Sequence, residues 1–106
     1  MMTKILWLSQ QRPEPVQVRA LEKIFGGKVE IVRKLEEYPE PADIVKLYKE
    51  GNYNDIVVVA CTALISQLVE LGLRPLWPEM VKTDKGACFG HFRRIRRVVK
   101  GIFEFA

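Results

Sequence analysis

Cysteine and histidine are scarce in this chain, which has two cysteines and one histidine among 106 residues. Cys61 and Cys88 are too far apart in the sequence for a paired zinc motif, and a reducing compartment would keep both as thiols. We expect both thiols to be buried, with Cys61 the candidate for reactivity because it follows a predicted strand. His91 has no partner in a recognisable catalytic pattern. The sequence therefore indicates no metal site and no catalytic residue.

Glycine-rich phosphate loops and long hydrophobic runs are also missing. The loop after the first predicted strand reads SQQRPEP, without the glycines that let a backbone approach a dinucleotide, and no Walker loop is present. No apolar run approaches the roughly 18 residues of a membrane span, and the N-terminal apolar run is too short for a signal peptide. We therefore predict a soluble, cytoplasmic protein without a cofactor and without a membrane partner.

The residues that are abundant indicate a small globular domain. Hydrophobic residues make up 48% and charged residues 28% of the sequence, a balance that argues against a disordered chain. A length of 106 residues predicts a single α/β domain over residues 1–106. Charged and β-branched residues are frequent while serine, threonine and asparagine are rare, a bias that favours a thermophilic source.

Hydrophobic periodicity predicts strands and helices that alternate along most of the chain. Strands are indicated by continuous or alternating apolar residues, and helices by apolar residues three and four positions apart. Pro41 and Thr62, a natural N-cap, mark helix starts, whereas Gly26 and Gly51 mark helix ends. The expected strands cover 4–9, 28–34, 55–61 and 74–83, and the expected helices cover 15–27, 41–51 and 62–73.

The last quarter of the chain is predicted to form strands joined by tight turns. The sequence TDKG at 83–86 has turn chemistry, and Lys100 with Gly101 suits a two-residue turn or a bulge. An amphipathic helix over 91–100 is the alternative, because apolar residues recur there at spacings of three and four. Gly101 and neighbouring valines argue against that helix.

The alternation of elements predicts an α/β fold with a three-layer, Rossmann-like architecture. We expect a mainly parallel sheet in the order 2-1-3-4, with an antiparallel C-terminal edge strand or hairpin. This order of elements is similar to that of the Rossmann-like sensor domains associated with CRISPR systems. Those domains bind nucleotide second messengers over their strand ends, and the resemblance rests on element order.

Positive charge is concentrated in the C-terminal segment GHFRRIRRVVKGIFEFA, while the whole chain carries a formal net charge of +4. In a strand, these basic residues would point to both faces of the sheet, and a buried guanidinium needs a partner. We therefore expect this strand at an edge or beyond the domain. The residues predicted to bind nucleic acid or a nucleotide are Arg93, Arg94, Arg96, Arg97 and Lys100. Other possible roles are keeping an edge strand soluble, or pairing with the acidic segment 35–41 of a second copy in a homodimer.

A ligand site is predicted where the first and third strands end, since ligands of open parallel sheets sit beyond the carboxyl ends of the strands. Trp77 and Met80 are expected to form a wall, and the start of the helix at Thr62 favours an anion such as phosphate or carboxylate. The predicted ligand-binding residues are Ser9, Gln10, Gln11, Arg12, Cys61, Thr62 and Glu79.

Three functions remain open from the sequence. The favoured hypothesis is a non-enzymatic binding module that engages nucleic acid or a nucleotide through the basic strand. The second is a small enzyme or sensor that binds an anionic metabolite at the ends of the first and third strands. The third is a homo-oligomeric interaction protein without a ligand.

Overall fold

The computed structural model of this chain describes residues 2–34 and 40–106. These residues form a mixed α/β structure in which three helices pack against a sheet of six strands. In chain order, the elements are β1 (Thr3–Leu8), α1 (Pro15–Phe25), β2 (Val29–Arg33), α2 (Pro41–Glu50), β3 (Asp55–Val58), α3 (Thr62–Glu70), β4 (Leu76–Thr83), β5 (Gly86–Val99) and β6 (Ile102–Phe105).

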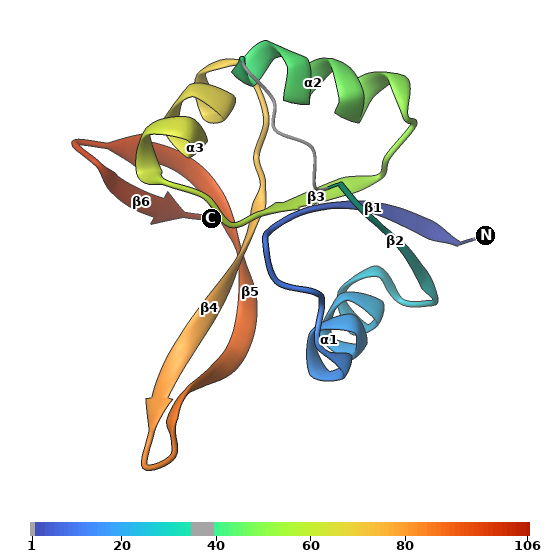
Figure 1. Ribbon diagram of the computed structural model, residues 1–106, viewed down its shortest axis with the longest axis vertical. Coiled ribbons are helices and arrows are strands. Elements are labelled where there is room, and N and C mark those ends of the chain that lie inside the picture. Colours follow the sequence, from blue (N-terminus) through green and yellow to red (C-terminus); the bar gives the residue numbers. More distant parts are fainter. Residues whose placement is uncertain (1, 35–39) are drawn as a thin grey trace.

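The strands lie in the order β2-β1-β3-β4-β5-β6 (Figure 1). β1 is parallel to both β2 and β3, and β3 is parallel to β4, so the predicted order of the first four strands is confirmed. β4, β5 and β6 then run antiparallel to one another as a meander. The sheet is therefore mixed rather than mainly parallel, because its longest pairing is the antiparallel one between β4 and β5.

Both faces of the parallel strands are covered by helices, α1 on one face and α2 with α3 on the other (Figure 1). Along β1 and β3, successive side chains point to opposite faces. Ile5, Trp7 and Val57 pack with Leu21 of α1. On the other face, the packed residues are Leu6, Ile56, Val58, Ile44 of α2, and Ile65 and Leu68 of α3. Burial on both faces explains the continuous apolar runs in these strands.

The two predicted C-terminal turns are confirmed. In the first, the Thr83 hydroxyl donates to the carbonyl of Gly86 at 2.8 Å. In the second, Lys100 and Gly101 have φ of 51° and 76°, which is the left-handed backbone of a two-residue hairpin between right-twisted strands. The helix considered for 91–100 is not formed, since these residues belong to β5 and the turn that follows it.

The predicted antiparallel C-terminal edge strand and hairpin are present, but the expectation that the arginine-rich strand is itself at the edge or beyond the domain is wrong for its middle part. β5 lies between β4 and β6, and β6 is the outermost strand. β5 also contributes to both apolar cores, with Phe92 8% exposed beside Trp7 and Ile95 completely buried on the opposite face. The β4–β5 hairpin extends away from the helices (Figure 1).

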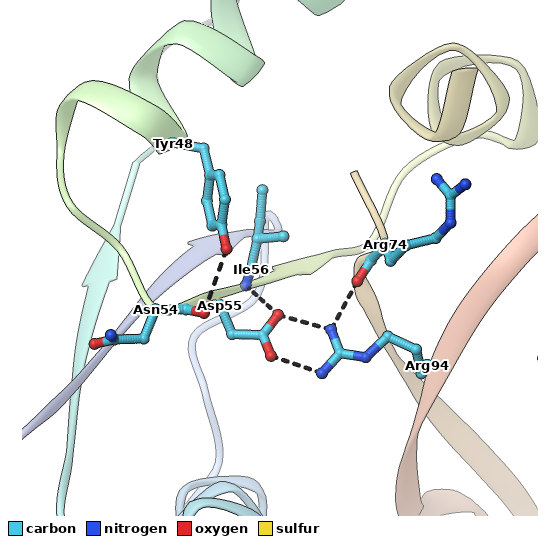
Figure 2. Close-up of polar contacts among 6 residues, drawn as sticks. All are labelled: Tyr48, Asn54, Asp55, Ile56, Arg74 and Arg94. Carbon is cyan, nitrogen blue, oxygen red and sulfur yellow. Dashed lines mark hydrogen bonds and ion pairs between the residues drawn. The ribbon is translucent and has the colours of Figure 1, made fainter. Parts of the chain in front are cut away.

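An interior position is possible for β5 because a carboxylate neutralises its most enclosed arginine. Arg94 binds Asp55 through two hydrogen bonds of 2.8 and 2.7 Å, and it donates a third to the carbonyl of Arg74 at 2.7 Å (Figure 2). The Asp55 side chain is only 10% exposed, and it also accepts the backbone N–H of Ile56 at 2.8 Å. Hydrogen bonding to Asp55 raises the pKa of Arg94, which keeps the ion pair charged.

This ion pair reinforces the sheet where its backbone pairing is shortest, between β3 and β4. β3 and β4 are paired only at Val57 and Leu76, which is a short contact between two strands. In register, Arg94 of β5 lies opposite Leu76 of β4, and its side chain reaches Asp55 at the start of β3. The ion pair therefore connects the parallel strands to the antiparallel meander.

Replacing Arg94 by methionine is expected to destabilise the fold, because the Asp55 carboxylate then stays buried without its cation. The expected loss is about 2–3 kcal/mol in the free energy of unfolding, measured by urea titration. Arg96→Met is the matched control, since Arg96 is exposed and has no ion pair with any described residue. This control should change stability by less than about 0.5 kcal/mol. Equal losses in both variants would contradict the role of the ion pair.

Ionisation of Tyr48 in α2 is expected to destabilise the fold at alkaline pH. Its hydroxyl donates to the carbonyl of Asn54 at 3.3 Å (Figure 2). Burial raises the pKa of Tyr48, and the Asp55 carboxylate raises it further, while Arg94 lowers it. The unfolded chain therefore releases the phenol proton first, and stability falls as the pH rises above about 10, the ordinary pKa of tyrosine. Urea titrations at pH 9 and 11 should show a larger loss for the wild type than for Tyr48→Phe. An identical loss in both proteins would contradict this assignment.

Candidate functional site

A cleft of about 370 Å³, which we call the strand-end cleft, lies beyond the carboxyl ends of β1 and β3 and beside the first part of β4. Its polar lining comes from the β1–α1 loop and the start of α1, and consists of Ser9, Gln10, Gln11, Glu14 and Gln17. Its apolar lining consists of Trp7, Val59, Trp77, Pro78 and Met80. The cleft therefore contains three residues of the predicted ligand site, Ser9, Gln10 and Gln11, together with the two predicted wall residues.

The cleft opens where β3 and β4 separate. These strands are paired only at Val57 and Leu76, and β3 ends one residue later at Val58. Two residues beyond Leu76, Pro78 has no N–H to donate to a neighbouring strand. Val59 and Pro78 both line the cleft that follows. The end of backbone pairing thus creates a space between the strands.

The β1–α1 loop is anchored by hydrogen bonds to its backbone. The indole N–H of Trp7 donates to the carbonyl of Gln11 at 2.9 Å, and the N–H of Gln11 donates to the Ser9 hydroxyl at 3.2 Å. The guanidinium of Arg33 donates to the carbonyl of Gln10. Because this wall is already held in place, a ligand would bind without ordering the loop, which lowers the entropic cost of binding.

Gln17 is the buried polar residue of the cleft, and the sequence analysis missed it. It is 8% exposed, and its Oε1 accepts the backbone N–H of Glu14 at 2.9 Å. This contact assigns the amide oxygen to the helix start and leaves the Nε2 donor for a ligand. The signal in the sequence is the E-P-x-Q pattern of Glu14, Pro15 and Gln17, in which a glutamine at the third helical position caps the start.

The lining of the strand-end cleft is neutral apart from one carboxylate. Among its described lining residues, Glu14 is the only charged one, and none is a lysine or an arginine. Amides donate and accept hydrogen bonds, and an indole ring offers a flat apolar surface. This chemistry suits a flat, uncharged group with hydrogen-bonding edges better than the small anion expected from the sequence.

The other predicted ligand-binding residues lie outside this cleft. Arg12 is exposed and lines a second cleft on the β2 side of the loop. Cys61 is the N-cap residue of α3 and Thr62 its first helical residue, so the predicted N-cap at Thr62 is wrong by one position. Both residues begin the helix on the face opposite α1 (Figure 1). Glu79 instead binds Arg93 of β5 at 3.1 Å.

The basic residues of β5 do not form one free cationic surface. Three arginines have carboxylate partners, with Arg93 bound to Glu79, Arg94 to Asp55, and Arg97 to Glu104 at 2.8 Å. The Arg93 guanidinium also lies 4.1 Å from the centre of the Phe105 ring. Exposed residues without an ion pair in the described part of the chain are Arg96 and Lys100. The acidic segment 35–41, predicted to pair with these arginines in a second copy, lies largely outside the described residues.

Some kinds of site are absent from the part of the chain that the structure describes. Within residues 2–34 and 40–106, no three histidine, cysteine or acidic side chains come together as metal ligands would. None of the helices in these ranges is long and apolar enough to cross a membrane. Comparisons of this chain with protein-family models, curated proteins and solved structures found no match.

The expectation that the two thiols are buried is wrong, since both Cys61 and Cys88 are exposed. Cys61 precedes α3, and Cys88 lies on the β4–β5 hairpin. We predict that a chromogenic aryl disulfide modifies two thiols per folded chain without denaturant. Cys61→Ser and Cys88→Ser should each remove one equivalent. A thiol that reacts only after urea is added would contradict its exposed position.

Proposed function

We propose that this chain is a small, non-enzymatic binding module with a three-layer, Rossmann-like architecture. Its proposed ligand is a nucleoside or the nucleoside part of a nucleotide, held in the strand-end cleft. The observation that carries this proposal is the lining of the cleft, where a buried, oriented amide of Gln17 lies near the exposed amides of Gln10 and Gln11 and beside indole rings.

The position of the cleft supports a ligand-binding role. Open α/β sheets bind ligands beyond the carboxyl ends of their parallel strands, and this cleft lies beyond the ends of β1 and β3. Its volume of about 370 Å³ falls within the usual range for small-molecule sites. Helices on both faces of the parallel strands support the proposed architecture.

The chemistry of the cleft supports a nucleobase as the recognised group. Glutamine amides pair with the donor and acceptor edges of bases, and aromatic side chains stack on their faces. Trp77 is half-buried, lines the cleft and packs edge-on against Phe103 at 4.9 Å between ring centres, whereas Trp7 is 1% exposed and its indole N–H is bonded to Gln11. The stacking surface is therefore assigned to Trp77.

The same lining favours binding over catalysis. General acid–base catalysis uses titratable groups placed on the reacting atoms, commonly as a pair. Glu14 is the only such group among the described residues that line the cleft. A nucleic-acid role for β5 has less support than a nucleoside site, because Arg93, Arg94 and Arg97 are engaged with carboxylates. A homodimer stays a prediction.

Titration with adenosine, guanosine, cytidine and uridine tests this proposal. We expect at least one nucleoside to quench tryptophan fluorescence saturably and to raise the unfolding midpoint, because it binds only the folded chain. Gln17→Met, which keeps the length of the side chain but removes its donor, should weaken binding roughly tenfold.

Gln67→Met is the matched control, since Gln67 is exposed on α3, away from the cleft, and its affinity should equal that of the wild type. Trp77→Phe should remove most of the quenching while Trp7 keeps its own emission. The proposal fails if no nucleoside binds at millimolar concentration. It also fails if Gln17→Met, folded as shown by its unfolding transition, binds as tightly as the wild type.

A further inference from the structure

A second cleft lies on the other side of the β1–α1 loop, between the start of α1 and the edge strand β2. Its volume is about 570 Å³, and its described lining is Arg12, Pro13, Val18, Val29, Ile31 and Arg33. Val29, Ile31 and Arg33 alternate along β2, so their side chains share the face of the sheet that α1 covers. Val29 and Ile31 therefore form an apolar floor, and Arg33 lies at the carboxyl end of β2.

Two guanidinium groups share this cleft without a carboxylate among its described lining residues. In β5, by contrast, arginines are neutralised by carboxylates, since Arg93, Arg94 and Arg97 each have an acidic partner. Neither Arg12 nor Arg33 forms an ion pair with a described residue. Two like charges against an apolar wall repel each other unless an anion joins them.

Arg33 also has an unsatisfied donor. One of its terminal nitrogens donates to the carbonyl of Gln10, while its Nε is buried and has no hydrogen-bond partner. Buried polar groups almost always find a partner in folded proteins, and for a guanidinium that partner is an ordered water or an oxyanion.

We propose that this second cleft is an oxyanion site, in which Arg33 and Arg12 bind the phosphate group of a small metabolite. Arg33 supplies the rigid, half-buried contact from the end of β2, and Arg12 supplies an exposed contact from the loop. Val18 and Ile31 line the apolar part, which suits a ligand with a carbon skeleton attached to its phosphate. This site is separate from the strand-end cleft, which has no cation among the lining residues that the structure describes.

Calorimetric titration with inorganic phosphate tests the site, with chloride at matched ionic strength as the reference because surface charges are screened by salt. We expect saturable binding of one phosphate per chain. Arg12→Gln and Arg33→Gln should each weaken it roughly tenfold, since each removes a charged hydrogen-bond donor. Arg19→Gln is the matched control, because Arg19 is an exposed arginine of α1 that does not line the cleft.

Arg12→Gln keeps the test decisive even if Arg33→Gln loosens the loop through its lost contact with Gln10. The side chain of Arg12 is exposed, so this variant should fold like the wild type. No phosphate binding beyond the chloride reference, or equal affinity in Arg12→Gln and Arg19→Gln, would overturn the proposal. Phosphate is titrated without nucleoside, so this result and that of the nucleoside titration are independent.

Discussion

The fold depends on the ion pair between Arg94 and Asp55. It joins two parts of the sheet that share little backbone pairing, because β3 and β4 meet only at Val57 and Leu76. Arg94 belongs to the antiparallel meander and Asp55 to the parallel strands, so the guanidinium holds the two parts in register. Removing Arg94 would leave the Asp55 carboxylate, which is only 10% exposed, without its cation.

The weak pairing between β3 and β4 also shapes the candidate site. The ion pair holds β3 and the meander together at the amino end of β3. Beyond Val58, β3 and β4 separate, and Pro78 has no N–H with which to continue their pairing. The strand-end cleft opens there, against a loop that Trp7 and Arg33 hold by its carbonyl groups. The same Arg33 lines the second cleft, so the β1–α1 loop separates two spaces of different chemistry. One side offers amides and indoles, and the other offers guanidinium groups.

Much of the fold was predictable, while less of the candidate site was. Apolar runs such as those in β1 and β3 indicated strands covered on both faces, and the turn at Lys100 and Gly101 followed from local residue chemistry. The position of β5 was predicted wrongly, because its arginines were counted as unpaired charges. Their partners Asp55, Glu79 and Glu104 lie on three other strands. Gln17 was missed for a related reason, since its burial depends on where α1 packs and not on its own residue type.

The sequence by itself determined the succession of strands, helices and turns, and with it the order of the first four strands. These features depend on periodicity, caps and connection lengths, all of which are local in the chain. Only the tertiary structure decided which charges are neutralised and which donors remain free. Arg94 finds its carboxylate far along the chain, whereas Arg33 has a buried nitrogen without an acceptor. Pairing between distant side chains is set by packing, and packing is what separates a structural arginine from one available to a ligand.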